Sequence, residues 1–410
     1  MRVAIVGGGV IGLLCAHHLV RRGAHVIVVE RHRIGAGCSA GNAGWVTPSL
    51  AVPLPAPGLR WKSLRWMLRR DSPLYIRPRA ALAMAPWLLG FWRCCNRPQF
   101  ERGVAAMARL GADTFDLYDQ LAADGVEYEC HRTGLLMAFR SRQEMREERE
   151  MLELVGYTDL EPLSAAEVGD REPTLDRGVA AGIRVRPERT VRPEHLCSGV
   201  AKGLLEAGSE IVERTTVEGV CLEGRSARAL RTAIGEIDAD AVLIATGAEA
   251  GRLAASCGLR LPLQAGKGYS VTVSGPRVRP LQPLYLSDSK VGVTPFDDGV
   301  RIAGTMELSG INLELDRVRL AALKRGAERD VPRVTEGRES VDWVGMRPLT
   351  PDGLPILGRL PERDNLFVAT GHQMLGVTLA PSTGRVMAEL ILDGRGETEL
   401  EPFSPARFAR

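Results

Sequence analysis

The sequence of 410 residues lacks a long hydrophobic run. No apolar stretch reaches the ~18–20 residues of a membrane-spanning helix, and the nearest candidate is residues 80–92. This segment and the preceding residues 58–70, which are rich in arginine and tryptophan, form either a surface helix that touches a membrane or two packed helices. We favour the two packed helices, because the apolar stripe is discontinuous.

The sequence also lacks paired cysteines and an excess of charge. Its eight cysteines include no C-x-x-C pair and no metal-ligand spacing, so we expect reduced thiols and no metal site. The 53 basic and 50 acidic residues leave a net charge of +3, which argues against a nucleic-acid partner because such a partner requires a concentrated basic face. No Ser-His-Asp arrangement or pair of catalytic carboxylates stands out.

The N-terminus and the length indicate the location and organisation of the chain. The chain begins directly with a predicted core strand, so we expect no cleaved leader. We predict a cytoplasmic protein, with peripheral contact to the inner face of the cell membrane as the alternative. A chain of 410 residues is too long for one ordinary core, and the usual ~100–200 residues per domain predict two domains.

The first thirty residues read as a strand, a glycine turn, a helix and a second strand. Gly7, Gly9 and Gly12 have the G-x-G-x-x-G spacing. We expect Gly7 to allow the tight turn, Gly9 to let a pyrophosphate approach the backbone, and Gly12 to let the helix pack closely on the strand. Glu30 ends the second strand at the offset of an acid that binds a ribose hydroxyl. This order predicts a dinucleotide-binding unit, with phosphates at the N-terminus of the helix.

The next segment, residues 33–50, is rich in glycine and leads into a run of prolines. We predict a long extended loop in which Ser39, Asn42 and Gly44 line the cofactor. Periodicity and turn residues then predict the remaining elements. Helices are expected at 11–22, 102–124, 143–155, 192–207, 317–327 and from 376 onward, and strands at 3–6, 25–29, 134–139, 210–213, 218–222, 241–245, 266–273, 284–285, 291–294, 300–304 and 366–369.

Two later turns follow buried strands. Thr246 and Gly247 form a turn of the kind that accompanies a two-dinucleotide FAD fold. A last strand leads through Gly371 and His372 into a helix that starts at Gly376, and the N-terminus of such a helix would stabilise a reduced flavin. His372 would either assist this stabilisation or serve only as a hydrogen-bonding cap.

Arg347 lies in the apolar setting G-M-R-P. A buried guanidinium is costly unless it meets an anion, so Arg347 implies a carboxylate partner, which is either internal or a substrate.

Together, these motifs resemble the FAD-dependent amine and amino-acid oxidoreductases of the D-amino-acid oxidase superfamily, and most closely the bacterial D-amino-acid dehydrogenases. Similar segments are VAIVGGGVIG, SAGNAGWVTPS, RWMLRRDSPLYIRP, GKGYS and GMRPLTPDG with TGHQMLG. The later LAPSTG is instead similar to the glycine-oxidase branch, which can place a second basic residue where this chain has Met374.

The resemblance implies a fold and a chemistry. The fold would be α/β, with a two-dinucleotide-binding (Rossmann-like) FAD domain and an α+β substrate domain that has a mixed sheet. FAD would be bound non-covalently, hydride would leave the α-carbon of a neutral amine for flavin N5, and the imine would hydrolyse to a 2-oxo acid. Arg347 would hold the substrate carboxylate. Tyr269, after a turn at 266–268, would lie over the substrate or be a core residue.

These inferences predict a set of site residues and domain boundaries. The FAD domain would comprise residues 1–58, 190–262 and 345–410, and the substrate domain residues 59–189 and 263–344. The predicted catalytic residues are Arg347, Tyr269 and His372; the predicted cofactor-binding residues are Gly7, Gly9, Val10, Ile11, Gly12, Glu30, Arg31, Ser39, Asn42, Ala43, Gly44, Val217, Thr246, Gly247, Gly371, Leu375, Gly376, Val377 and Thr378.

The predicted substrate is a D-amino acid or a related cyclic or N-substituted amino acid, and a glycine/sarcosine-type or larger secondary-amine oxidase is the alternative. An NAD(P)-linked enzyme would need a second glycine motif, and a flavin hydroxylase would have G-D in place of T-G-H. A non-catalytic flavoprotein subunit would need an internal acid for Arg347. The expected electron acceptor is oxygen or a quinone.

Overall fold

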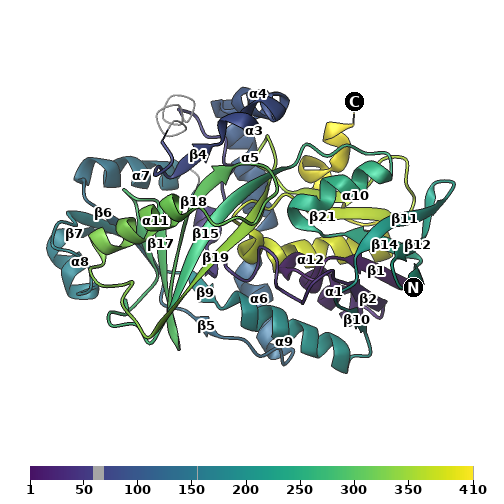
Figure 1. The fold of residues 1–410 in the computed structure, drawn as a ribbon, viewed down its shortest axis with the longest axis horizontal. Helices are drawn as coiled ribbons and strands as arrows, with labels where there is room; N and C mark the ends of the chain where they lie inside the picture. The colour runs from purple at the N-terminus through teal and green to yellow at the C-terminus, as the bar shows by residue number, and fades with distance from the viewer. Residues whose placement is uncertain (59–68, 155, 410) are drawn as a thin grey trace.

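The fold places a mostly parallel sheet beside a large mixed sheet, as Figure 1 shows. The computed structural model describes residues 1–58, 69–154 and 156–409. The surface helix considered for residues 58–70 therefore falls almost entirely outside the described residues. Within the described ranges, no helix is both long and apolar enough to cross a membrane.

The first sheet has six strands in the order β10-β2-β1-β14-β21-β20. All neighbours are parallel except β20, which runs antiparallel to β21. Alternate residues of β1 enter two different cores, which explains why this strand is apolar throughout. The strands are β1 (Arg2–Val6), β2 (His25–Val29), β10 (Glu210–Val212), β14 (Ala241–Ile244), β20 (Ile356–Arg359) and β21 (Leu366–Thr370).

Helices cover one face of this sheet and a small antiparallel sheet covers the other. On one face, α1 (Val10–Arg21) packs against both α12 (Gly376–Asp393) and α9 (Pro193–Glu206). The other face is covered by α10 (Ala250–Ser256) and by the sheet β11 (Val217–Glu223), β12 (Ser226–Thr232) and β13 (Gly235–Asp238). The predicted strand, glycine turn, helix and second strand at the N-terminus are thus confirmed.

The second sheet has nine strands in the order β19-β15-β18-β17-β16-β6-β8-β7, with β4 added beside β18. It is mixed, because β16 is parallel to β6 and β4 is parallel to β18 while the other pairs are antiparallel. The strands are β4 (Leu74–Ile76), β6 (Leu135–Phe139), β7 (Leu160–Ser164), β8 (Ala181–Val185), β15 (Gln264–Ser274), β16 (Leu284–Leu286), β17 (Val291–Phe296), β18 (Gly299–Leu308) and β19 (Glu339–Leu349).

The remaining elements surround this sheet and connect it to the first one. The helix α11 (Arg317–Asp330) packs on the sheet, and a small sheet in the order β3-β9-β5 lies next to the glycine-rich loop. The other elements are α3 (Pro78–Ala83), α4 (Ala85–Cys94), α5 (Arg97–Leu110), α6 (Thr114–Ala123), α7 (Arg142–Leu154), α8 (Ala165–Arg171), α13 (Glu397–Leu400), β3 (Trp45–Val46), β5 (Cys130–His131), β9 (Arg189–Val191) and 3-10 turns at Pro48–Leu50, Gly247–Glu249, Glu401–Phe403 and Pro405–Phe408.

Three sequence expectations need correction. The helix predicted over residues 102–124 is two helices, α5 and α6, and the first of them ends at its C-cap, Gly111. The loop expected over 33–50 contains the short strand β3 and a 3-10 turn. The turn expected at 266–268 lies inside β15, which is hydrogen-bonded to β19 and β18.

Packing explains why β15 contains two glycines. A Cβ at Gly266 would collide with Met306, and a Cβ at Gly268 would collide with the guanidinium of Arg347. The glycines therefore make room for neighbouring side chains and do not turn the chain. The division into two domains stays a prediction, and its boundary at 345 falls within β19.

A buried acid between β8 and β9 gives a stability prediction. The side chain of Glu188 is 1% exposed, and its Oε1 atom accepts a hydrogen bond from the backbone of Ser49 at 3.1 Å. Burial raises the pKa of Glu188 from 4.5 to about 7. Between these values the unfolded chain releases the proton and the folded chain keeps it, so the free energy of unfolding falls as the pH rises.

Glu188→Gln removes this loss, because glutamine does not ionise. We expect the stability of the variant, relative to the unsubstituted protein, to increase by about 2–3 kcal/mol between pH 5 and pH 8. Urea unfolding at the two pH values measures the difference. Glu150→Gln, a substitution of an exposed glutamate on α7, serves as the control and should show no such change. A pH-independent difference for Glu188→Gln would contradict the prediction.

Candidate active site

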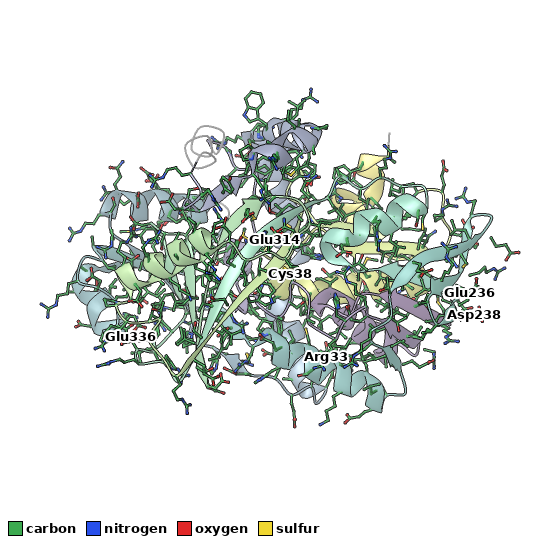
Figure 2. The ribbon with its side chains drawn as sticks, in the orientation of Figure 1. Arg33, Cys38, Glu236, Asp238, Glu314 and Glu336 are labelled. Carbon is green, nitrogen blue, oxygen red and sulfur yellow. The ribbon has the colours of Figure 1, made fainter. Side chains whose placement is uncertain are left out.

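A cavity of about 780 Å³ lies where the glycine-rich loop, the large sheet and the start of α12 meet. Figure 2 labels Cys38, one of its lining residues, near the middle of the molecule. The sequence-predicted residues Arg347 and Tyr269 both line the cavity. Further lining residues come from the glycine-rich loop (Gly41, Asn42, Ala43, Trp45, Thr47), from β15 and β18 (Gly268, Thr305) and from the start of α12 (Met374, Leu375, Thr378).

The glycine turn between β1 and α1 has the geometry that its sequence predicts. Gly7 has φ +110°, and its N–H donates to the carbonyl of Val29 at 2.9 Å. A Cβ at Gly12 would collide with the carbonyl oxygen of Gly7, so Gly12 is required for the close packing of α1. A Cβ at Gly9 would instead meet only Ser39 Oγ, at 3.4 Å, so the protein itself leaves room there.

The residues around this turn orient its donors. Ser39 Oγ accepts the N–H of Val10 at 3.1 Å, in the first turn of α1. The carboxylate of Glu30 accepts the N–H of Gly8 at 2.8 Å and the N–H of His32 at 2.9 Å, which places the acid directly beside the turn. Arg31 instead forms a two-point ion pair with Glu249.

Arg347 lies on β19 and its side chain enters the cavity. Its Nη1 atom donates to the carbonyl of Thr305 at 2.7 Å, and Thr305 has the left-handed backbone angle φ +56°. Among the residues that the structure describes, Arg347 pairs with no carboxylate. The pKa of Arg347 lies below its usual value, mainly because the guanidinium is buried. The nearby Cys38 partly offsets this effect, and the positive charge of Arg319 adds to it. The site therefore offers a partly buried cation whose anion must come from elsewhere.

A family model described as "FAD dependent oxidoreductase" matches residues 2–390. The chain belongs to this family. It is 33% identical over 422 residues to a D-amino acid dehydrogenase of Methylobacterium nodulans, which covers 100% of both chains. It is also 33% identical to a D-amino acid dehydrogenase of Cereibacter sphaeroides, with 100% of this chain and 96% of the relative covered. Glycine oxidase from Geobacillus kaustophilus has a similar structure, with a TM-score of 0.78, 25% identity and 99% of each chain covered.

The cofactor of this oxidoreductase is FAD, and its described residues fit that group. Neither α1 nor α12 has a side-chain N-cap, so the first-turn donors other than the N–H of Val10, which Ser39 Oγ accepts, are available for an acceptor. Thr246 Oγ1 is buried and has no hydrogen-bond partner within the described residues. Gly247 and Gly371, at the ends of β14 and β21, have φ +56° and +79°. These features suit a bound ligand with many acceptor atoms.

Other predicted cofactor residues have partners that position the loop. Asn42 Oδ1 accepts the N–H of Gly44 at 2.8 Å, and the carbonyl of Asn42 accepts a hydrogen bond from Arg301 at 2.9 Å. Thr378 Oγ1 donates to the carbonyl of Trp45 at 3.1 Å, which ties α12 to the loop. Val217 begins β11 and packs in the core on the far face of the first sheet.

Tyr269 contributes its ring to the cavity, but its hydroxyl points into a buried charge cluster. The hydroxyl donates to Glu307 Oε2 at 2.5 Å. Lys267 Nζ lies 3.5 Å from Glu307 Oε1, and Arg319 Nε lies 3.6 Å from Glu307 Oε2. Burial and the carboxylate of Glu307 raise the pKa of Tyr269. Tyr269 is therefore a neutral wall of the cavity, held in place by Glu307.

His372 lies apart from the cavity lining. Its side chain is 2% exposed, and Nε2 lies 3.0 Å from Thr383 Oγ1, further along α12. Burial lowers the pKa of His372 to about 3, so the ring is neutral. Its catalytic role stays a prediction, and its position favours a role in holding the turn before α12.

Arg319 and Glu307 were missed by the sequence reasoning. Arg319 is the largest fully buried side chain, and its guanidinium donates to Thr305 Oγ1 and, at 3.0 Å, to the carbonyl of Met306. It therefore holds the same strand end that anchors Arg347. The sequence signal that could have indicated this cluster is the presence of charged residues within otherwise apolar strands, such as Lys267 in GKGYS and Glu307 in β18.

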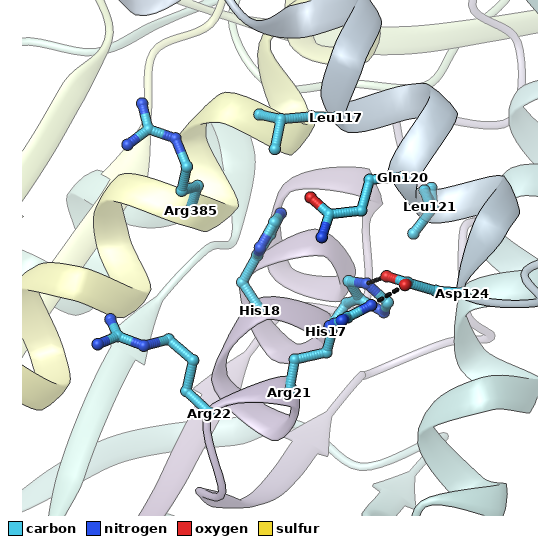
Figure 3. A pocket seen from close by; sticks show the side chains of 9 residues that line it. All are labelled: His17, His18, Arg21, Arg22, Leu117, Gln120, Leu121, Asp124 and Arg385. Atoms are coloured by element: carbon cyan, nitrogen blue, oxygen red, sulfur yellow. Dashed lines mark hydrogen bonds and ion pairs between the residues drawn. The ribbon is translucent and has the colours of Figure 1, made fainter.

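A second pocket, of about 220 Å³, lies at the C-terminal end of α1 (Figure 3). Its charged side chains already have partners: Asp124 pairs with His17 and Arg21, and Arg385 pairs with Asp113. The pocket thus lies at the end of α1 opposite the glycine turn, and each of its three arginines, Arg21, Arg22 and Arg385, pairs with a carboxylate.

One group of possible metal ligands lies elsewhere. Glu129, His131 and Asp297 have ligand atoms within 4.8 Å of one another, but Arg192 and His195 also pair with Glu129. The expectation of no metal site stays a prediction.

Proposed function

We propose that this FAD-dependent oxidoreductase oxidises a D-amino acid, or a related cyclic or N-substituted amino acid, to an imine that hydrolyses to a 2-oxo acid. The observation that carries the proposal is the guanidinium of Arg347, which lines the cavity without a carboxylate partner among the described residues. The names of the relatives support a D-amino acid as the substrate. The substrate carboxylate would be the anion that Arg347 lacks.

The site residues would bind, orient and desolvate the substrate. FAD, when bound, supplies the hydride acceptor. Arg347 forms a planar fork that fixes the carboxylate, and thereby selects the face of the α-carbon that is presented for oxidation. The surrounding lining is mainly apolar, so it disfavours the ammonium form and lowers the pKa of the substrate amine. The neutral amine needed for oxidation is then available without a dedicated base.

We propose the same roles for the predicted cofactor residues as the sequence indicates. The glycine turn and Glu30 would hold the dinucleotide, and the start of α12 would lie at the flavin. The acceptor for the electrons would be oxygen or a quinone. Peripheral contact with the inner face of the cell membrane is proposed as the alternative to a purely cytoplasmic protein.

An anaerobic titration of the FAD-loaded protein tests the proposal. Paired D- and L-amino acids, D-proline, glycine and sarcosine are added while the flavin absorbance is followed. We expect at least one D-amino acid to bleach the flavin band and its L-enantiomer not to do so. Admission of air then separates the acceptors, because rapid recovery of the band indicates oxygen. Bleaching by glycine or sarcosine but by no D-amino acid would favour the glycine/sarcosine-type alternative, and bleaching by no member of the panel would overturn the proposal.

A further inference from the structure

The cavity continues beyond Arg347 into an apolar chamber. We define the chamber by Leu74 and Ile76 of β4, Trp87 and Leu88 of α4, Met306 of β18 and Leu349 of β19, and all six residues line the cavity. Figure 1 shows β4 and α4 above the end of β18. Arg347 Nη1 lies 3.8 Å from Met306 Sδ, so the chamber begins directly beside the guanidinium.

The chamber walls have their polar groups satisfied by the protein. The N–H of Met306 donates to Pro73 at 2.7 Å, and the carbonyl of Leu308 accepts from Arg77 at 2.9 Å. The indole N–H of Trp87 donates to the carbonyl of Pro262 at 3.0 Å. Among the described residues, no buried side-chain atom of the chamber is left without a hydrogen-bond partner. A polar occupant would lose its hydration there without compensation, so the walls favour an apolar group.

The far end of the cavity differs in character. It carries Glu148, Tyr285 and Lys290, and Lys290 Nζ lies 5.6 Å from the centre of the Tyr285 ring. A charged substrate side chain would be directed to this end. Contact between Arg347 and Met306 instead connects the carboxylate anchor to the apolar end.

We infer that the substrate carries a bulky apolar side chain, of the leucine, methionine or phenylalanine type, which occupies the chamber while Arg347 holds the carboxylate. This inference rests on the proposed function. It adds a side-chain preference to that function, because the chamber lies directly beside the guanidinium that would hold the carboxylate. Trp87 also stacks on Phe91, a second aromatic residue of α4 that lines the cavity, with ring centres 5.4 Å apart.

The test uses simple carboxylates as probes, so it does not depend on turnover. Acetate, butanoate, hexanoate and 3-phenylpropanoate are titrated into the FAD-loaded protein, and the dissociation constant is measured by calorimetry. If the chain enters the chamber, the affinity should increase about fourfold for each added methylene group, as expected for burial of hydrocarbon. Equal affinity for acetate and hexanoate would overturn the chamber as the side-chain site.

Two tryptophan variants on α4 locate the binding. Leu88 lines the chamber, whereas the neighbouring Leu89 is 45% exposed and does not line it. We expect Leu88→Trp to weaken the binding of hexanoate at least tenfold and to leave the binding of acetate unchanged. We expect Leu89→Trp to bind all the carboxylates with the same dissociation constants as the unsubstituted protein. Equal effects of the two variants on hexanoate would overturn the assignment. If Leu88→Trp does not retain FAD, the dependence of affinity on carboxylate chain length in the unsubstituted protein still tests the inference.

The failure of this inference and the failure of the proposed function give different results. On the active protein we expect kcat/KM for D-phenylalanine, D-leucine or D-methionine to exceed that for D-alanine at least tenfold. Preference for D-alanine or for charged D-amino acids overturns the inference and leaves the proposed function intact. If carboxylate affinity rises with chain length but no amino acid reduces the flavin, the proposed function is overturned, and the assigned substrate is overturned with it.

Discussion

Arg347→Lys is expected to raise KM for the amino-acid substrate about 100-fold while the protein keeps its FAD. The guanidinium is held by the carbonyl of Thr305 through Nη1, which leaves the rest of its planar fork for a carboxylate. A lysine ammonium is a point charge and does not reproduce two parallel hydrogen bonds. Losing a charged hydrogen bond costs about 1.5–3 kcal/mol, and the upper part of that range corresponds to the expected factor.

Gly268→Ala provides an independent variant that retains the arginine. A Cβ at this position would collide with the guanidinium of Arg347, which is the movable end of a flexible side chain. We expect the guanidinium to shift, and KM to rise, with little loss of stability. Steady-state kinetics and the flavin-to-protein absorbance ratio distinguish a carboxylate anchor from a general loss of structure. An unchanged KM in Arg347→Lys would remove Arg347 from the site.

Gly9→Ala is expected to weaken FAD binding at least 100-fold without destabilising the protein that lacks FAD. Gly9 has φ −78° and ψ 175°, which alanine adopts without strain. The added Cβ would meet only Ser39 Oγ, at an ordinary 3.4 Å. The reason for glycine at this position would then be the approach of the pyrophosphate to the backbone. Titration of the protein without FAD, followed by flavin fluorescence, gives the dissociation constant.

Gly12→Ala separates this ligand effect from a packing effect. Its Cβ would collide with the carbonyl oxygen of Gly7, so this variant should lower the melting temperature even without FAD. Gly203→Ala in α9 is the matched control. Like Gly12, Gly203 lies inside a helix, but a Cβ at Gly203 would meet nothing within 4 Å. If Gly9→Ala binds FAD normally, the glycine turn does not hold the pyrophosphate as predicted.

The N-terminal unit could be read from the sequence because its signals are local. Residues 3–6 and the three glycines lie within ten residues of one another, and each has a single physical reason for its position. The same holds for the strand and turn before Gly376, where the helix begins as predicted. Identity of the cofactor followed from the resemblance carried by these motifs, and the family match confirms it.

Other features depend on contacts between distant segments. The strand predicted over residues 266–273 is confirmed, but the turn predicted at 266–268 is wrong, because these residues lie within the strand and the missing Cβ atoms of the two glycines accommodate Arg347 and Met306. The role of Tyr269 was open for a similar reason, because its hydroxyl partner, Glu307, lies 38 residues away in the chain. The sequence pattern of one strand does not indicate which side chains of a neighbouring strand will pack against it.

By itself, the sequence determined the glycine turn after the first strand and the type of most helices and strands, because short-range periodicity and glycine geometry specify them. The likeness to flavin-dependent oxidoreductases came from the resemblance of its motifs to that family. Only the tertiary structure decided that Arg347 lacks an internal carboxylate partner among the described residues, and that β4 and α4 line an apolar chamber beside it. These features arise where β18 and β19 meet segments more than 200 residues earlier in the chain. The surroundings of Arg347 and of the chamber depend on packing between segments that are distant in the sequence, so the neighbours of a residue along the chain do not reveal them.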